Sequence, residues 1–164
     1  MAYQRLQVSG AIDVIPSDTV PIPDPASRVM NSAANFTVAG QVTGALGFTT
    51  KGIQKNAILY NYGASQAYTV VSVDSDTQLT LTPSVAGNAA DNFVIFNAPT
   101  LAATLYVGGA GNISVEMASN RDDALVPGVN PTIFNSVAAG TFMPTLVTKV
   151  RAASTTATNI KALF

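Results

Sequence analysis

The chain has 164 residues, a formal net charge of -1 and only 10% charged residues, against about 25% in an ordinary globular domain. It contains no cysteine and no histidine, which excludes disulfides, thiol catalysis, cysteine metal sites and histidine-based catalytic triads. The near-neutral charge also argues against a generic nucleic-acid partner. So few charges repel neighbouring molecules weakly, and we therefore expect other subunits to cover much of the folded surface.

The N-terminal part opens with a short alternating segment rather than with the apolar core of a signal peptide. Two long uncharged runs, residues 92–115 and 124–148, are broken by proline and glycine and alternate as strands do. We expect neither an export signal nor a membrane span from these patterns.

A proline-rich segment follows, with four prolines between residues 16 and 25. Proline fixes φ and removes a backbone donor, so the segment is expected to be extended and polyproline-like. Two interpretations stay open, a simple linker and an arm that lies across a neighbouring subunit. The candidate contact residues of such an arm are Ile15, Pro16, Val20, Pro21, Ile22 and Pro23.

Residues 30–98 carry a series of short apolar or β-branched stretches bounded by turn formers, which is typical of a small barrel or sandwich. The expected strands are 36–38, 57–62, 68–73, 78–82 and 93–96. The clearest unit is a hairpin that turns at residues 74–77, where Asp and Ser side chains hydrogen-bond their own backbone. A calcium loop is not favoured there, because the required glycine and distant glutamate are missing.

Three tyrosines in this region, Tyr60, Tyr62 and Tyr68, have two possible roles. They are either core and interface residues or stacking platforms for a carbohydrate ligand. The pattern favours the first role.

The C-terminal third begins with two alternating stretches joined by glycines at 108, 109 and 111. Leu105 and Val107 share one face and Tyr106 takes the other, while Ile113 and Val115 share a face beyond the glycines. This pattern predicts a β-hairpin. A phosphate-binding loop is not favoured, because a strand rather than a helix follows the glycines.

The last residues predict two more strands around a turn at 153–156. Leu146, Thr148 and Val150 are expected on one face, with Val147, Lys149 and Arg151 on the other. Pairing of these two strands would bring Lys149, Arg151 and Lys161 together. The cluster is either a solvated edge face or a basic patch that docks on carboxylates of a partner.

The polar loop 118–131 carries Arg121, Asp122 and Asp123. Adjacent carboxylates on a polar loop usually face water, so we interpret it as a solvated loop or subunit contact rather than an acid-base site. No constellation of residues points to catalysis, a cofactor or a metal, and the chain is not expected to be an enzyme.

Three of these segments together, 15–23, 105–113 and 137–164, resemble a family of small tailed-bacteriophage virion proteins, the head-spike base and capsid-surface proteins. Members combine a proline-rich arm, a glycine hairpin and a closing strand near a Thr-Thr-Ala-Thr turn. They pass almost directly from the arm to the hairpin, whereas here residues 30–98 intervene. The resemblance implies a virion protein at the capsid surface that is assembled in the host cytoplasm.

We therefore expect an all-β protein with two domains. The first is a discontinuous β-sandwich or barrel formed by 1–29 and 99–164, which assembles on the capsid, and the second is an inserted barrel-like domain, 30–98. The expected function is to decorate or cement the capsid, or to form a head-spike base. Its partners would be the major capsid protein and the chain itself, as a closed trimer or pentamer, with no nucleic acid and no membrane. The alternatives are an outward-facing carbohydrate or receptor module and a neck or tail component.

Overall fold

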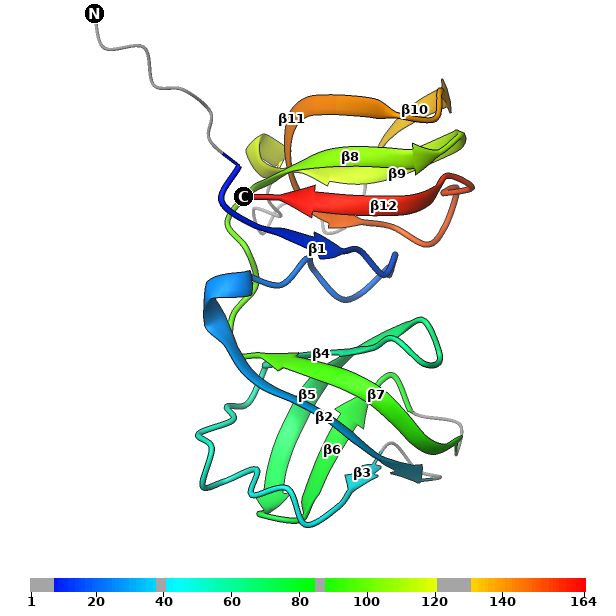
Figure 1. The fold of residues 1–164 in the computed structure, drawn as a ribbon. Helices are drawn as coiled ribbons and strands as arrows, with labels where there is room; N and C mark the ends of the chain where they lie inside the picture. Colours follow the sequence, from blue (N-terminus) through cyan, green and yellow to red (C-terminus); the bar gives the residue numbers. More distant parts are fainter. Residues whose placement is uncertain (1–7, 38–40, 85–87, 121–130) are drawn as a thin grey trace, which may run out of the picture. The chain divides into compact units, whose positions relative to one another are not determined.

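The computed structural model describes residues 8–37, 41–84, 88–120 and 131–164. The expected all-β fold is confirmed, since the described residues form antiparallel strands and two short 3-10 turns, Pro25–Ser27 (η1) and Ala118–Asn120 (η2). The chain divides into two compact units (Figure 1). Unit 1 comprises Met1–Val14 and Leu101–Phe164, and unit 2 comprises Ile15–Thr100.

Unit 2 is a closed antiparallel barrel with strand order β2-β3-β6-β5-β4-β7. Its strands are β2 (Arg28–Thr37), β3 (Gln41–Thr43), β4 (Ile58–Asn61), β5 (Gln66–Ser75), β6 (Gln78–Thr82) and β7 (Asn88–Phe96). Large side chains that are buried along these strands and the loop before β4 fill the barrel, among them Phe48, Leu59, Tyr68, Leu79, Phe93 and Ile95. Burial of this apolar area is the main stabilising contribution to the unit.

The expected hairpin at residues 74–77 is confirmed by the antiparallel pairing of β5 with β6, in which Ser75 lies opposite Gln78. The loop that contains Thr50 is hydrogen-bonded to this turn. Thr50 donates its backbone N–H to Asp76 Oδ1 at 2.7 Å and its hydroxyl to Asp76 Oδ2 at 3.0 Å. These hydrogen bonds, first from the backbone and then from the hydroxyl, lower the pKa of the Asp76 carboxyl.

The proline-rich segment belongs to unit 2, so the division after Val14 falls earlier than the expected boundary at residue 29. Its apolar side chains explain the difference. Val20 and Ile22 are buried, and Val20 packs in unit 2 against Ile58, Tyr60 and Phe96. Pro23 forms an antiparallel bridge with Pro99, and Thr100 donates its N–H to the Ile22 carbonyl at 2.8 Å.

Unit 1 is a six-stranded antiparallel sheet with strand order β1-β12-β8-β11-β9-β10. Its strands are β1 (Ala11–Asp13), β8 (Ala103–Gly109), β9 (Gly111–Met117), β10 (Thr132–Val137), β11 (Thr141–Val150) and β12 (Thr158–Leu163). In Figure 1, β1 and β12 lie side by side although they come from opposite ends of the chain. The arrangement is consistent with a β-sandwich.

The strand β11 changes partners along its length. Its first half pairs with β8, with Phe142 opposite Tyr106, and its second half pairs with β9, with Val150 opposite Val115. The register shifts between residues 143 and 147 and again between 147 and 149. Irregular strands of this kind turn the corners of β-sandwiches.

The predicted hairpin at residues 105–117 is wrong. Both strands form, and Leu105, Val107, Ile113 and Val115 are buried as expected, but β8 pairs with β11 and β12 while β9 pairs with β10 and β11. The glycines instead carry the chain past a close backbone neighbour. Gly111 has φ +155°, and a Cβ there would lie 2.5 Å from the Ala157 backbone nitrogen.

The turn before β12 is hydrogen-bonded to the residues that follow Gly111. Thr156 and Ala157 donate their N–H groups to the Asn112 carbonyl at 2.8 and 3.0 Å, and Asn112 donates its N–H to Thr156 Oγ1 at 2.9 Å. The Thr155 hydroxyl accepts the Ser114 N–H at 2.9 Å. The threonines of this turn therefore position β12 by hydrogen bonds to the start of β9.

The expected faces of β11 are also wrong. Val147 and Val150 were assigned to opposite faces by simple alternation, yet both side chains are buried. The register shift between Val147 and Lys149 adds a residue to the strand and resets the alternation.

Candidate functional site

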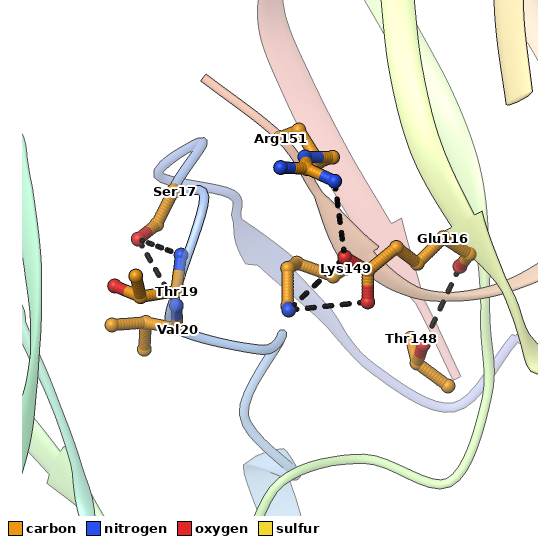
Figure 2. Close-up of polar contacts among 7 residues, drawn as sticks. All are labelled: Ser17, Thr19, Val20, Glu116, Thr148, Lys149 and Arg151. Atoms are coloured by element: carbon orange, nitrogen blue, oxygen red, sulfur yellow. Dashed lines mark hydrogen bonds and ion pairs between the residues drawn. The ribbon is translucent and has the colours of Figure 1, made fainter. Parts of the chain in front are cut away.

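The candidate arm residues point largely into unit 2. Ile15, Val20 and Ile22 are buried, and Ile15 and Val20 join a cluster with Ile58, Tyr60 and Phe96. Pro23 is buried, whereas Pro16 and Pro21 are half-buried. The segment is fixed by a local turn, shown in Figure 2, in which Ser17 Oγ accepts the N–H groups of Thr19 at 3.3 Å and Val20 at 3.1 Å. The side chains of Ile15 and Val20 are therefore already packed within their own unit.

Two of the candidate basic residues, Lys149 and Arg151, come together around Glu116, whereas Lys161 does not join them, so the expectation is wrong for Lys161. The part of β11 that carries Lys149 pairs with β9, whereas β12 pairs with β1 and β8. Lys149 Nζ lies 3.1 Å from both oxygens of Glu116, and Arg151 Nη1 lies 3.8 Å from Glu116 Oε1 (Figure 2). Lys161 forms an ion pair with Asp13 on the neighbouring strand.

These ion pairs account for the charged side chains of unit 1 that the structure describes, namely Asp13, Glu116, Lys149, Arg151 and Lys161. The cations therefore have carboxylate partners within the unit. Because Lys149 and Arg151 share the single carboxylate of Glu116, an acidic partner would gain less from them than from two unpaired cations.

Two of the three candidate tyrosine platforms are inside the protein. Tyr60 and Tyr68 are each 1% exposed, whereas Tyr62 is 36% exposed. The Tyr60 ring meets the Tyr62 ring edge to face, with centroids 6.0 Å apart. Burial, and to a lesser degree the neighbouring Tyr62, raises the pKa of Tyr60 far above its ordinary range. Tyr60 and Tyr68 are therefore core residues and are not accessible to stack on a sugar.

The surface that the sequence reasoning missed lies on unit 1. Phe142 on β11 is 44% exposed and lies opposite Tyr106 on β8, which is 39% exposed. Tyr106 in turn lies opposite Lys161, and Lys161 opposite Asp13. Directly opposite residues share a face of the sheet, so this row runs from two aromatic rings to an ion pair. The alternation of Tyr106 with Leu105 and Val107 was the signal that could have predicted the exposed ring.

A groove of about 350 Å³ lies beside this row, between β10 and the first half of β11. None of its lining residues is charged, and two of them are threonines. They are Phe134, Val137, Ala138, Thr141, Phe142, Met143, Pro144 and Thr145. We define the Phe142 face as the residues that line this groove, including Phe142, together with Tyr106. The face offers burial of apolar area, and its polar side-chain groups are the hydroxyls of Tyr106, Thr141 and Thr145.

The described residues contain no group of three or more acidic side chains that could hold a metal ion. No helix in the described ranges is long and apolar enough to cross a membrane. The loop residues Arg121, Asp122 and Asp123 lie outside the described residues.

Comparisons with protein-family models, with curated proteins and with solved structures found no match for this chain.

Proposed function

We propose that this chain is a non-enzymatic structural protein of a tailed-bacteriophage virion. In this proposal it decorates or cements the capsid surface, or forms a head-spike base, by binding the major capsid protein and copies of itself. Unit 1 is the binding part. The bacteriophage context comes from the sequence resemblance, and the binding role comes from the surface of unit 1.

The observation that carries the proposal is the placement of aromatic side chains in unit 1. In the described part of this unit no aromatic residue is buried, and Tyr106 and Phe142 are the most exposed, followed by Phe134 and Phe164. Aromatic residues are enriched at the centres of protein interfaces, where each ring buries a large area. Since the charges described in unit 1 are paired internally, apolar burial is the interaction that this surface has to offer.

The carbohydrate alternative has less support, because Tyr60 and Tyr68 are buried. Of the three candidate tyrosines only Tyr62 is accessible, and one ring provides little of the stacking area that a sugar platform needs.

The proposal is tested with phage particles assembled without the chain. Purified chain is added to these particles, which are then sedimented and challenged by heating. We expect saturable binding and a higher temperature of genome release, because a cementing protein buries surface that must be exposed when the shell opens. Failure of the folded chain to sediment with particles would contradict the proposal.

A further inference from the structure

Two strands of unit 1 each have a side without a neighbour in the described part of the chain. β10 ends the sheet and pairs only with β9. In β11, residues 144–146 pair with neither β8 nor β9, because the β8 ladder is interrupted after Met143 and the β9 ladder begins at Val147. The described backbone hydrogen bonds outside the ladders include none from these three residues. Their N–H and C=O groups are therefore open to another backbone.

The groove of the Phe142 face lies along these two strands. None of its lining residues belongs to β9 or β8, so it opens where β10 and the first half of β11 lack a neighbour. Thr145 Oγ1, in the same lining, is buried and has no hydrogen-bond partner among the described residues. Buried polar groups are seldom left unpaired, which indicates that this site lacks a hydrogen-bonding partner as well as an apolar one.

The two edges of the sheet differ in their protection. β1, at the other edge, has three residues, and its Asp13 forms an ion pair with Lys161. Short strands and charges keep sheet edges from pairing with other chains. β10 has six residues and no charge, and its Ile133 is 45% exposed. Its residues 132–134 pair regularly with β9 before a bulge, and this stretch has neither protection.

These features together favour an extended polypeptide segment as the occupant. Unpaired backbone groups along a strand pair with another extended backbone, which a small apolar ligand does not supply. Alternate side chains of an extended segment point to one face, so every second side chain would enter the groove. A charged side chain at these positions would be buried without a partner, because none of the lining residues is charged.

A second copy of this chain is a poor donor of such a segment. Every described strand is already paired in the sheet of unit 1 or in the barrel of unit 2. In the proline-rich segment, Ile15 and Val20 pack within unit 2. A copy would therefore have to unfold a described segment before donating it, whereas an extended segment of another protein avoids that cost.

We propose that unit 1 binds an extended segment of a different protein by strand addition at the groove between β10 and β11. The segment carries uncharged, apolar side chains at alternate positions. This inference rests on the binding role proposed for unit 1 and adds the kind of segment that it recognises.

The test begins with a random heptapeptide library that is selected on the immobilised full chain. We expect the enriched peptides to carry β-branched or aromatic residues, and no charge, at alternate positions. The leading peptide is then remade twice, with N-methyl groups on one or the other set of alternate amides. N-methylation removes N–H donors and keeps the side chains, so at least one of the two should bind at least about tenfold more weakly.

Variants of the chain locate the binding site. Phe142→Asp should bind the leading peptide at least about tenfold more weakly, because it places a charge in the groove. The matched control is Val71→Asp, since Val71 lies on unit 2 and is 41% exposed, close to the 44% of Phe142. Circular dichroism confirms that each variant is folded, and Phe142→Ala serves as a second variant of the groove.

Several results would overturn the inference. These are a library without enriched peptides, enriched peptides with charges at the alternate positions, two methylated peptides that bind like the parent, and a folded Phe142→Asp variant that binds like the Val71→Asp control. Sedimentation velocity with and without the leading peptide tests a second copy as the occupant. Self-association that the peptide abolishes would assign the groove to a copy and overturn the inference, whereas an oligomeric state that the peptide leaves unchanged supports it.

The outcome is separable from that of the particle-binding test. A chain that sediments with particles but enriches no peptide would remove this inference and leave the proposed function standing. A chain that binds the peptide in the groove but never binds particles would do the reverse.

Discussion

The two units place their aromatic side chains in opposite ways. Unit 2 buries Phe48, Tyr60, Tyr68 and Phe93 almost completely, whereas unit 1 leaves Tyr106 and Phe142 more than one-third exposed. Burial of a phenylalanine or tyrosine is among the largest single contributions to a small core. Unit 2 therefore uses these aromatic residues for its own stability, and we propose that the exposed rings of unit 1 serve contact with other molecules.

The core of unit 1 is made of smaller side chains. Its buried residues are aliphatic, including Leu105, Val107, Ile113, Val115, Val147 and Val150. These residues form the interior of the unit, and the rings of Tyr106 and Phe142 lie at its surface. The comparison teaches that the residues that form the cores of this chain differ from those that we propose for binding.

Two matched phenylalanine truncations should show the largest difference. Phe93→Ala removes a ring that is 0% exposed and should lower the free energy of unfolding by about 3–5 kcal/mol, because it leaves a cavity in the barrel. Phe142→Ala removes a ring that is 44% exposed and should change the free energy of unfolding by less than about 1 kcal/mol. Urea unfolding of dilute protein measures both values. Equal losses would break the comparison, because Phe142 would then be a core residue.

A substitution at Gly111 should show that the fold of unit 1 depends on the close approach of two backbone segments, at Gly111 and at Ala157. Gly111→Ala should lower the free energy of unfolding by about 2 kcal/mol or more, since the added Cβ meets the Ala157 backbone and φ is +155°. The control is Gly10→Ala, where nothing lies within 4 Å of the added Cβ. Thermal or urea unfolding distinguishes the two variants, and a Gly111→Ala protein as stable as the control would contradict the close approach.

A smaller effect is expected from the carboxylate of Asp76 in unit 2. Its hydrogen bonds from Thr50 lower its pKa below the ordinary value of 3.8. The lowered pKa contributes stability that is present above the ordinary value and is lost as the pH falls through the folded-state value. Asp76→Asn should therefore flatten the decline in unfolding free energy below about pH 4.

Unfolding curves collected at a series of acidic pH values measure this slope. Thr50→Val removes the hydroxyl donor but keeps the backbone donor, so it should flatten the curve less than Asp76→Asn does. Parallel curves for wild type and Asp76→Asn would show that this carboxylate does not contribute to acid unfolding.

The sequence predicted strands better than it predicted their partners. Alternation correctly placed Leu105, Val107, Ile113 and Val115 in the interior, because side chains of a strand alternate whatever strand lies beside it. Pairing depends on the whole sheet, and consecutive strands such as β8 and β9 need not pair. The hairpin of β5 and β6 was predictable because its own turn residues define it.

Other features had weaker signals. The start of β2, with Arg28, Asn31 and Ser32, is poor in β-branched and aromatic residues, and β10 was not predicted as a separate strand within the alternating run 124–148. The extra residue in β11 cannot be located by alternation, so its two valines were assigned to opposite faces. The Phe142 face was not predicted because it depends on the pairing of β11 with β8, which local alternation does not reveal.

The measurement that tests the central claim most directly is the copy number of this chain in purified phage particles. Quantitative mass spectrometry gives the ratio of the chain to the major capsid protein. We predict a fixed ratio across preparations, of the size expected for a protein spread over the shell. A much lower fixed ratio would place the chain at vertices, neck or tail, and its absence from particles would contradict the account.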